Sequence, residues 1–179
     1  DVIVQIGDHW DMESLCSYDK GKTSFEGRRY KKDIESGNKA MDLFLKPIKK
    51  EMKRLKDNKQ KQWKPRFVFT MGNHEQRIAR AVEYDSILEG TIGYEDLNLK
   101  DWEVYDYLQP VVIESVAFAH FFTTGIMGRP CTSARAMLTK KMMSTVMGHV
   151  QDRDIAYAKR ADGVRLTGLF AGMFTQHDE

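Results

Sequence analysis

The chain has 179 residues, of which 41% are hydrophobic and 30% charged, and its formal net charge is +2. This length and composition are those of a folded globular protein rather than of a disordered chain. No apolar run approaches the roughly 20 residues that a membrane-spanning helix needs, so we expect no membrane partner. The two cysteines, Cys16 and Cys131, lie far apart in the sequence, which is typical of reduced thiols and predicts a cytoplasmic location.

The N-terminal part of the chain predicts a strand, a loop and a long helix. Residues 1–6 predict a buried strand, and because the chain begins inside it we expect a fragment that lacks a preceding strand. Residues 8–32 predict a loop. Residues 33–58 predict a helix, because apolar residues recur there at helical spacing. Pro47 lies inside that pattern and either kinks one helix or begins a second one.

This helix lies in a basic segment. Residues 18–66 contain 17 Lys/Arg and 7 Asp/Glu, a net charge of +10, whereas the rest of the chain contains 11 and 19, a net charge of −8. Such a block can attract a polyanion such as DNA or RNA. A helix surface that is only solvated by water would have the same composition, so both interpretations stay open.

The remaining elements are shorter. Residues 66–71 predict a strand and residues 75–83 a helix, and the pattern between 84 and 108 is unclear apart from a candidate strand at 102–105. The later elements are a strand pair at 111–113 and 116–120, a loop at 121–130, a helix at 132–143 capped by Thr132 or Ser133, a strand at 145–147 and a hairpin of 155–160 with 164–170. Strands that alternate with helices early and pair antiparallel late favour an α/β fold, with two sheets flanked by helices in a single domain.

Polar side chains follow four of the apolar runs. Asp8 follows the first run after a glycine, Asn73 and His74 follow the run at 67–71, and His120 and His149 end the later two runs. In α/β folds the carboxyl ends of strands are where binding sites lie. Carboxylate, amide and imidazole groups are all ligands of divalent metals. The sequence therefore predicts a metal site formed from these strand ends.

The motifs resemble, in kind and in order, those of the calcineurin-like metallophosphoesterases. They read Gly7-Asp8-x-x-Asp11, Gly72-Asn73-His74-Glu75, His120 and Gly148-His149-x-Gln151. The resemblance implies a four-layer α/β/β/α sandwich, here without its first strand. Two departures are clear. The family's first motif, Asp-x-His, is absent, and Gln151 stands where the family has a second histidine.

The resemblance also implies a centre with two divalent ions. Asp8, Asn73, His120 and His149 would hold one ion, with Asp8 bridging to the other. Gln151 would occupy a ligand position of the other ion, with an amide oxygen that binds more weakly than an imidazole. The expected metal is Mn²⁺, with Fe, Zn, Mg and Ni as alternatives.

The resemblance also implies roles for two further motif residues. His74 would be the acid that protonates the leaving oxygen or would stabilise the charge of the transition state, and Asp11 would orient it. Other residues are placed by their positions in the chain. Arg77, one turn into the following helix, would either grip a phosphate oxygen or form an exposed ion pair. His9 would lie behind the site or on the surface, and His177 would line the site or belong to the chain terminus.

The predicted function is a metal-dependent phosphoester hydrolase in which water attacks phosphorus. The basic segment favours a phosphodiesterase or nuclease acting on DNA or RNA. One alternative is a phosphomonoesterase acting on phosphoproteins or small molecules. Another is a non-catalytic phosphate-binding module, which Gln151 and the missing first motif support. The retained His74 and Asp11 oppose it, because a binding module has no need of a general acid.

Overall fold

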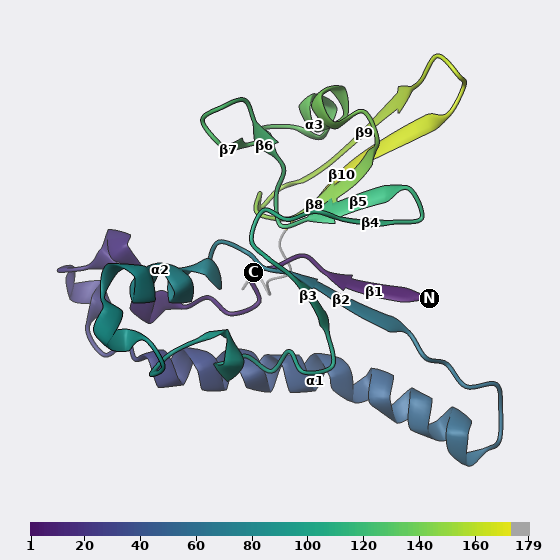
Figure 1. Ribbon diagram of the computed structural model, residues 1–179. Coiled ribbons are helices and arrows are strands. Elements are labelled where there is room, and N and C mark those ends of the chain that lie inside the picture. Colours follow the sequence, from purple (N-terminus) through teal and green to yellow (C-terminus); the bar gives the residue numbers. More distant parts are fainter. Residues whose placement is uncertain (173–179) are drawn as a thin grey trace, which may run out of the picture. The chain divides into compact units, whose positions relative to one another are not determined.

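A computed structural model describes residues 1–172 and shows a mixed α/β protein (Figure 1). Its helices are α1 (Tyr30–Asp57), α2 (Gln76–Tyr84) and α3 (Ala134–Lys141). Its strands are β1 (Val2–Gln5), β2 (Arg66–Thr70), β3 (Glu103–Tyr105), β4 (Val111–Ile113), β5 (Val116–Ala119), β6 (Thr123–Thr124), β7 (Arg129–Pro130), β8 (Ser144–Met147), β9 (Arg153–Lys159) and β10 (Arg165–Ala171). Short 3-10 turns are η1 (Glu13–Leu15), η2 (Ser17–Asp19), η3 (Thr23–Phe25), η4 (Ser86–Leu88) and η5 (Tyr94–Asp96).

Within this described part the strands form three sheets. One sheet has the order β1-β2-β3, the largest has the order β4-β5-β8-β10-β9, and β6 pairs with β7 in a small hairpin. In the largest sheet β8 runs parallel to both β5 and β10, whereas β4 and β9 pair antiparallel with their neighbours. The outer strands are therefore antiparallel hairpin partners of a parallel centre.

The chain forms two compact units that interleave along the sequence. Unit 1 comprises Asp1–Ile3, Asp8–Val68 and Asn73–Glu103. Unit 2 comprises Val4–Gly7, Phe69–Gly72 and the chain from Val104 onward. The chain therefore leaves unit 2 and enters unit 1 directly before Asp8 and again directly before Asn73.

In unit 1, α1 is one continuous helix of 28 residues that contains Pro47. The sequence left open whether Pro47 kinks one helix or begins a second one, and the structure has a single helix there. Pro47 lies on the exposed side of the helix, so the carbonyl group that its missing N–H leaves unpaired can be hydrated. The opposite side buries Met41 and Leu45 before the proline, and Ile48, Met52 and Leu55 after it are half-buried. Because apolar residues are packed both before and after the proline, the helix continues through it.

Trp10 packs the loop that follows β1 against α1. Its side chain is fully buried, and a Cβ placed on Gly37 would lie 1.9 Å from the Trp10 Cδ1 atom. Only a glycine leaves room for the indole ring at this point of the helix. The indole Nε1–H donates to Asn38 Oδ1 at 3.0 Å, and the same oxygen accepts the backbone N–H of Asn98 at 2.9 Å. This packing fixes the residues on both sides of Trp10.

In unit 2, α3 covers one face of the five-stranded sheet. Ser133 caps this helix, since its hydroxyl oxygen accepts the backbone N–H of Ala136 at 3.1 Å, which confirms the serine as the cap. The buried cluster between helix and sheet consists of Ala117, Ala119, Phe121, Phe122, Cys131, Ala134, Met137, Met147 and Phe170.

The other face of this sheet carries an apolar row. The strand registers align Val111 with Phe118, Phe118 with Val146, Val146 with Leu169, and Leu169 with Ile155. Paired residues point to the same side of a sheet, so five apolar side chains run across all five strands. They alternate along the strands with the residues packed on α3.

Most predicted elements are confirmed, and three details differ. The strand at the N-terminus is half-buried rather than buried. The helix of the basic segment begins at Tyr30, three residues early. The stretch at 121–130, predicted as a loop, contains the hairpin β6–β7, because backbone pairing of Thr123 with Pro130 closes it. Among residues 1–172, no helix has the length and apolarity needed to cross a membrane.

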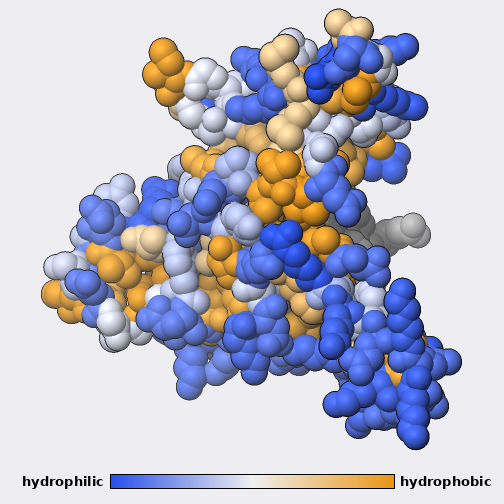
Figure 2. Space-filling view, turned by 45° about the vertical axis from the view of Figure 1, so that its right-hand side comes forward, coloured by the Kyte–Doolittle hydropathy of each residue, from blue (hydrophilic) through white to orange (hydrophobic). Residues whose placement is uncertain are grey.

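The basic segment gives α1 a hydrophilic surface that Figure 2 shows over its C-terminal end. The exposed cations on this part of the helix are Lys49, Lys50, Lys53, Arg54 and Lys56. Two of them are partly neutralised. Lys49 pairs with Asp101 at 2.8 Å, and Arg54 pairs with Glu51 at 2.8 Å.

Candidate functional site

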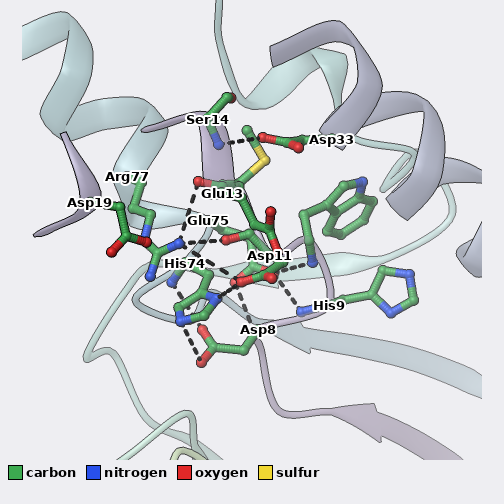
Figure 3. Close-up of polar contacts among 12 residues, drawn as sticks. Asp8, His9, Asp11, Glu13, Ser14, Asp19, Asp33, His74, Glu75 and Arg77 are labelled. Atoms are coloured by element: carbon green, nitrogen blue, oxygen red, sulfur yellow. Dashed lines mark hydrogen bonds and ion pairs between the residues drawn. The ribbon is translucent and has the colours of Figure 1, made fainter. Parts of the chain in front are cut away.

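A buried carboxylate organises the loop that follows β1. Glu75 is fully buried, and its two oxygens accept the backbone N–H groups of Asp8 at 2.9 Å, His9 at 2.7 Å and Trp10 at 2.9 Å (Figure 3). Hydrogen bonds to an ionised acceptor are about twice as strong as neutral ones. Glu75 therefore ties the loop to the start of α2. Glu75 belongs to the motif Gly72-Asn73-His74-Glu75, but the sequence alone predicts no role for it.

Asp8 lies in this loop with a left-handed backbone, at a φ angle of 55°. Residues other than glycine seldom adopt this conformation, and it persists only where surrounding contacts impose it. Two contacts impose it here: Glu75 accepts the Asp8 N–H, and Asp8 Oδ1 accepts the backbone N–H of His74 at 2.9 Å. The Asp8 carboxylate is thus held beside His74.

The ring of His74 is held between two carboxylates. Its Nδ1 lies 2.7 Å from Asp11 Oδ1, and its Nε2 lies 3.9 Å from Asp8 Oδ2 (Figure 3). An ionised carboxylate only accepts, so Nδ1 carries the hydrogen in this contact. The hydrogen bond from His74 is the largest cause that lowers the pKa of Asp11, and the nearby charge of Arg77 lowers it further. Asp11 therefore stays ionised and keeps the ring oriented.

Arg77 supports the same loop from α2. Its Nη1 donates to the carbonyl oxygens of Asp11 at 2.7 Å and Met12 at 3.3 Å, and it lies 3.8 Å from Asp11 Oδ1. The guanidinium thus holds Asp11 in place. Its predicted role in gripping a substrate phosphate stays a prediction.

His9 points away from His74 in Figure 3. Its Nε2 contacts the carbonyl oxygen of Gly37 at 3.1 Å, and its ring packs edge-on against Trp10 at 4.7 Å between centroids. Burial lowers the pKa of His9, an effect that the Gly37 hydrogen bond partly offsets. Its position behind the loop agrees with the first of the two predicted alternatives.

In unit 2, two imidazoles meet. His120 Nε2 lies 3.2 Å from His149 Nδ1, and the His120 Nδ1 lies 2.8 Å from the carbonyl oxygen of Ile6. The carbonyl can only accept, so Nδ1 carries the hydrogen in this contact, and in the neutral form of the ring Nε2 is the nitrogen that can bind a metal. This is the arrangement of metal-binding histidines, which donate their other N–H to a carbonyl or carboxylate. His149, like Asp8, has a left-handed backbone, at a φ angle of 64°.

The strand ends in unit 2 approach each other very closely at Gly7 and Gly72. A Cβ on Gly7 would lie 2.6 Å from the Gly72 backbone nitrogen and 2.7 Å from the carbonyl oxygen of Thr70. Gly7 also has a φ angle of 86°. A side chain is excluded at this position on both grounds, so the glycine that precedes Asp8 is required by backbone packing.

The predicted site residues are therefore divided between the units. Asp8, Asp11, Asn73, His74 and Arg77 belong to unit 1, and His120, His149 and Gln151 belong to unit 2. The predicted metal ligands are thus two in unit 1, a carboxylate and an amide, and three in unit 2, two imidazoles and the amide of Gln151.

Gln151 is exposed, and its predicted role as a weaker metal ligand stays a prediction. His177 lies outside the described residues. Cys16 and Cys131 are both free thiols, as predicted.

Comparisons with protein families, with curated proteins and with solved structures gave no significant match for this chain.

Proposed function

We propose that this protein is a metal-dependent phosphoester hydrolase of the calcineurin-like kind that cleaves phosphodiester bonds in nucleic acid. The observation that carries the proposal is the geometry around His74. Asp11 holds its Nδ1 at 2.7 Å, and the ring lies beside the Asp8 carboxylate. A histidine that is oriented by one carboxylate and adjacent to a second, metal-competent one is the arrangement of an acid catalyst in a hydrolytic site.

The chemistry of His74 follows from its hydrogen bonds. With Nδ1–H committed to Asp11, the proton exchanged with a substrate is the one at Nε2. Asp11 stabilises the protonated ring by its negative charge, so that His74 can give a proton to the leaving oxygen of a phosphoester. Arg77 and Glu75 keep this pair in position, because they hold the backbone on either side of Asp11.

The donor set suits divalent metals such as Mn²⁺. Asp8, Asn73, His120 and His149 offer the oxygen and nitrogen atoms that such ions bind, with Gln151 as a weaker oxygen donor. Bound ions would neutralise the charge of the phosphate and lower the pKa of a bound water molecule. The hydrogen bond from His120 to the Ile6 carbonyl supports the proposal, since it leaves Nε2 as the coordinating nitrogen.

We extend the proposal to the four-layer α/β/β/α fold. The face of the five-stranded sheet opposite α3 carries the apolar row that contains Phe118, Val146 and Leu169. Such a row is stable only when another layer covers it. A second sheet flanked by helices, as the resemblance implies, would supply that layer.

Nucleic acid is proposed as the substrate because residues 18–66 carry a net charge of +10. Lys50, Lys53 and Lys56 extend this charge along an exposed helix face. A phosphomonoester substrate has no polyanionic backbone for such a surface to bind. The charge distribution therefore favours the phosphodiester over the phosphomonoester.

The test is hydrolysis of two chromogenic esters by the purified protein with added Mn²⁺. We expect turnover of bis-p-nitrophenyl phosphate, a diester, in excess of that of p-nitrophenyl phosphate, and loss of both after chelation. A preference for the monoester would replace the proposed substrate with a phosphomonoester. Metal binding without hydrolysis of either ester would instead indicate a phosphate-binding module and overturn the proposal.

A further inference from the structure

One face of α2 leads away from His74 and carries two arginines and a tyrosine. Arg77, Arg80 and Tyr84 are spaced at three, four and seven residues, which places them in one row on a helix. From Arg77 to Tyr84 the row extends about 10 Å along the helix axis. Its first member already contacts the Asp11 loop, so the row begins at the candidate site.

A small pocket of about 70 Å³ lies along this row, between α2 and the turns η1 and η2. Its lining residues are Leu15, Ser17, Tyr18, Arg77, Arg80, Ala81 and Tyr84. Pockets that enclose a whole small molecule measure about 300–1,000 Å³. This one can therefore admit only a small group such as a phosphate, and the rest of a ligand must lie over the residues at its rim.

The rim residues are unusually exposed for their type. Tyr18 and Tyr84 have relative exposures of 81% and 82%. Neither ring is packed into a core, and neither hydroxyl makes a hydrogen bond to any part of the chain that the structure describes. Arg80 is also exposed, and it has no ion-pair partner between residues 1 and 172.

Two exposed aromatic rings beside an arginine without a salt bridge are the elements of a surface for single-stranded nucleic acid. Bases stack on aromatic rings regardless of sequence, and arginine binds the phosphate between them. A phosphopeptide would use the arginines but has no regular need of two rings. The rings therefore favour nucleic acid over a phosphorylated protein.

We propose that Tyr18, Tyr84 and Arg80 form a subsite for a single-stranded segment next to the scissile phosphate. Arg80 binds a neighbouring phosphate at the mouth of the small pocket, and the two tyrosines stack on bases. This subsite rests on the proposed function in that it names the substrate that His74 and Asp11 would act on.

The test is binding of a fluorescein-labelled oligothymidylate to the purified protein, measured by anisotropy at about 50 mM salt without added metal. A matched oligonucleotide of the same length without bases separates stacking from charge. Alanine replacement of a stacking ring typically removes about 1–3 kcal/mol per base. We therefore expect Tyr18→Ala and Tyr84→Ala each to weaken oligothymidylate binding by about 5- to 150-fold, with little effect on the abasic strand.

Conservative variants complete the design. Tyr18→Phe and Tyr84→Phe retain the ring and should bind as the unaltered protein does. Arg80→Gln should weaken binding of both strands and reduce the slope of log affinity against log salt by about 0.7, the value for one lost phosphate contact on a single strand. The matched charge control is Arg135→Gln, which replaces an exposed arginine on α3. It should change neither the affinity for the two strands nor the salt slope.

Two outcomes would overturn the subsite. One is equal affinity for the normal and abasic strands. The other is unaltered binding by the two alanine variants. If a phosphoserine peptide, and not the oligonucleotide, loses affinity in Arg80→Gln, the ligand is a phosphoprotein. Failure of the proposed function is distinguished by the chromogenic diester: a protein that does not hydrolyse it but shows the stacking effect has the subsite without the activity.

Discussion

His74 Nδ1 lies 2.7 Å from Asp11 Oδ1. The backbone of the loop that contains Asp11 is held by Arg77 on α2 and by the buried Glu75 directly before that helix. The contact fixes which nitrogen of the ring carries the hydrogen and which way the other nitrogen points. It also gives the ring an ionised partner, because the same hydrogen bond lowers the pKa of Asp11. Replacement of His74 and replacement of Asp11 therefore test different functions: the first removes the proposed proton donor, and the second removes only the carboxylate that orients it.

His74→Ala should retain metal binding and lose turnover by about 10²–10⁴-fold, the usual contribution of a positioned proton donor. Asp11→Asn should lose less, because an amide can still contact the ring but cannot stabilise its protonated form. The measurements are steady-state hydrolysis of bis-p-nitrophenyl phosphate and calorimetric titration with Mn²⁺. Loss of metal binding in His74→Ala would make His74 a ligand and reverse the assigned role.

Replacement of the proposed ligands should affect metal binding first. Changes to residues that only support a ligand cost about 10- to 100-fold in metal affinity, so Asp8→Ala and His149→Ala should each exceed that loss and abolish hydrolysis. Gln151→His should instead tighten binding, because an imidazole is a stronger ligand than an amide oxygen. Calorimetry with Mn²⁺ measures both. Affinity unchanged in Asp8→Ala would contradict the proposed donor set.

Glu75→Gln should destabilise the fold and disturb the site together. The amide that replaces the carboxylate has one acceptor oxygen, so at least one of the three backbone N–H groups that Glu75 binds loses its partner. An unsatisfied buried donor costs about 1–3 kcal/mol. Urea unfolding measures the loss, with the exposed Glu83→Gln on α2 as the control. Equal midpoints for the two variants would show that the loop does not depend on this carboxylate.

Gly37→Ala tests whether Trp10 fixes the loop. On an exposed helix face this change would stabilise by up to about 1 kcal/mol. Here the added Cβ would meet the Trp10 ring at 1.9 Å, and overpacking of this kind costs about 1–3 kcal/mol. Thermal unfolding gives the sign, with Lys39→Ala on the exposed face of α1 for comparison. A stabilised Gly37→Ala variant would mean that the ring can move without cost.

Much of the fold was predictable because its signals are local. The hairpin of β9 and β10 follows from turn chemistry, and a cap of α3 by Thr132 or Ser133 follows from capping preference, although only the structure selects the serine. Pro47 could not be decided locally, because both outcomes satisfy the proline ring. The structure resolves it through the burial of Met41 and Leu45 on the opposite side of one helix.

The candidate site was predictable as a set of residue types, but its supports were not. His74 and Asp11 are close in space only because the loop after β1 packs against α2. Contacts of Glu75, Trp10 and Gly37 hold the loop in that position. The sequence predicts no supporting role for any of the three, although Glu75 belongs to a motif. A buried glutamate that binds backbone N–H groups 65 to 67 residues away is visible only in three dimensions.

The basic helix gives the last prediction. The structure reduces the number of cations on α1 that can bind phosphates. Lys49 and Arg54 form ion pairs with Asp101 and Glu51, whereas Lys50 and Lys53 are exposed without an ion pair within residues 1–172. If α1 binds phosphates, the double variant Lys50→Glu/Lys53→Glu should weaken binding of duplex DNA. The slope of log affinity against log salt should flatten by about 0.9 for each lost contact, because fewer counterions are released.

Reversal of Lys140 and Lys159, two exposed lysines of unit 2, removes the same charge elsewhere and should leave the slope unchanged. Equal slopes for both double variants would show that α1 is only a solvated surface, and the case for nucleic acid would then depend on Tyr18, Tyr84 and Arg80 alone.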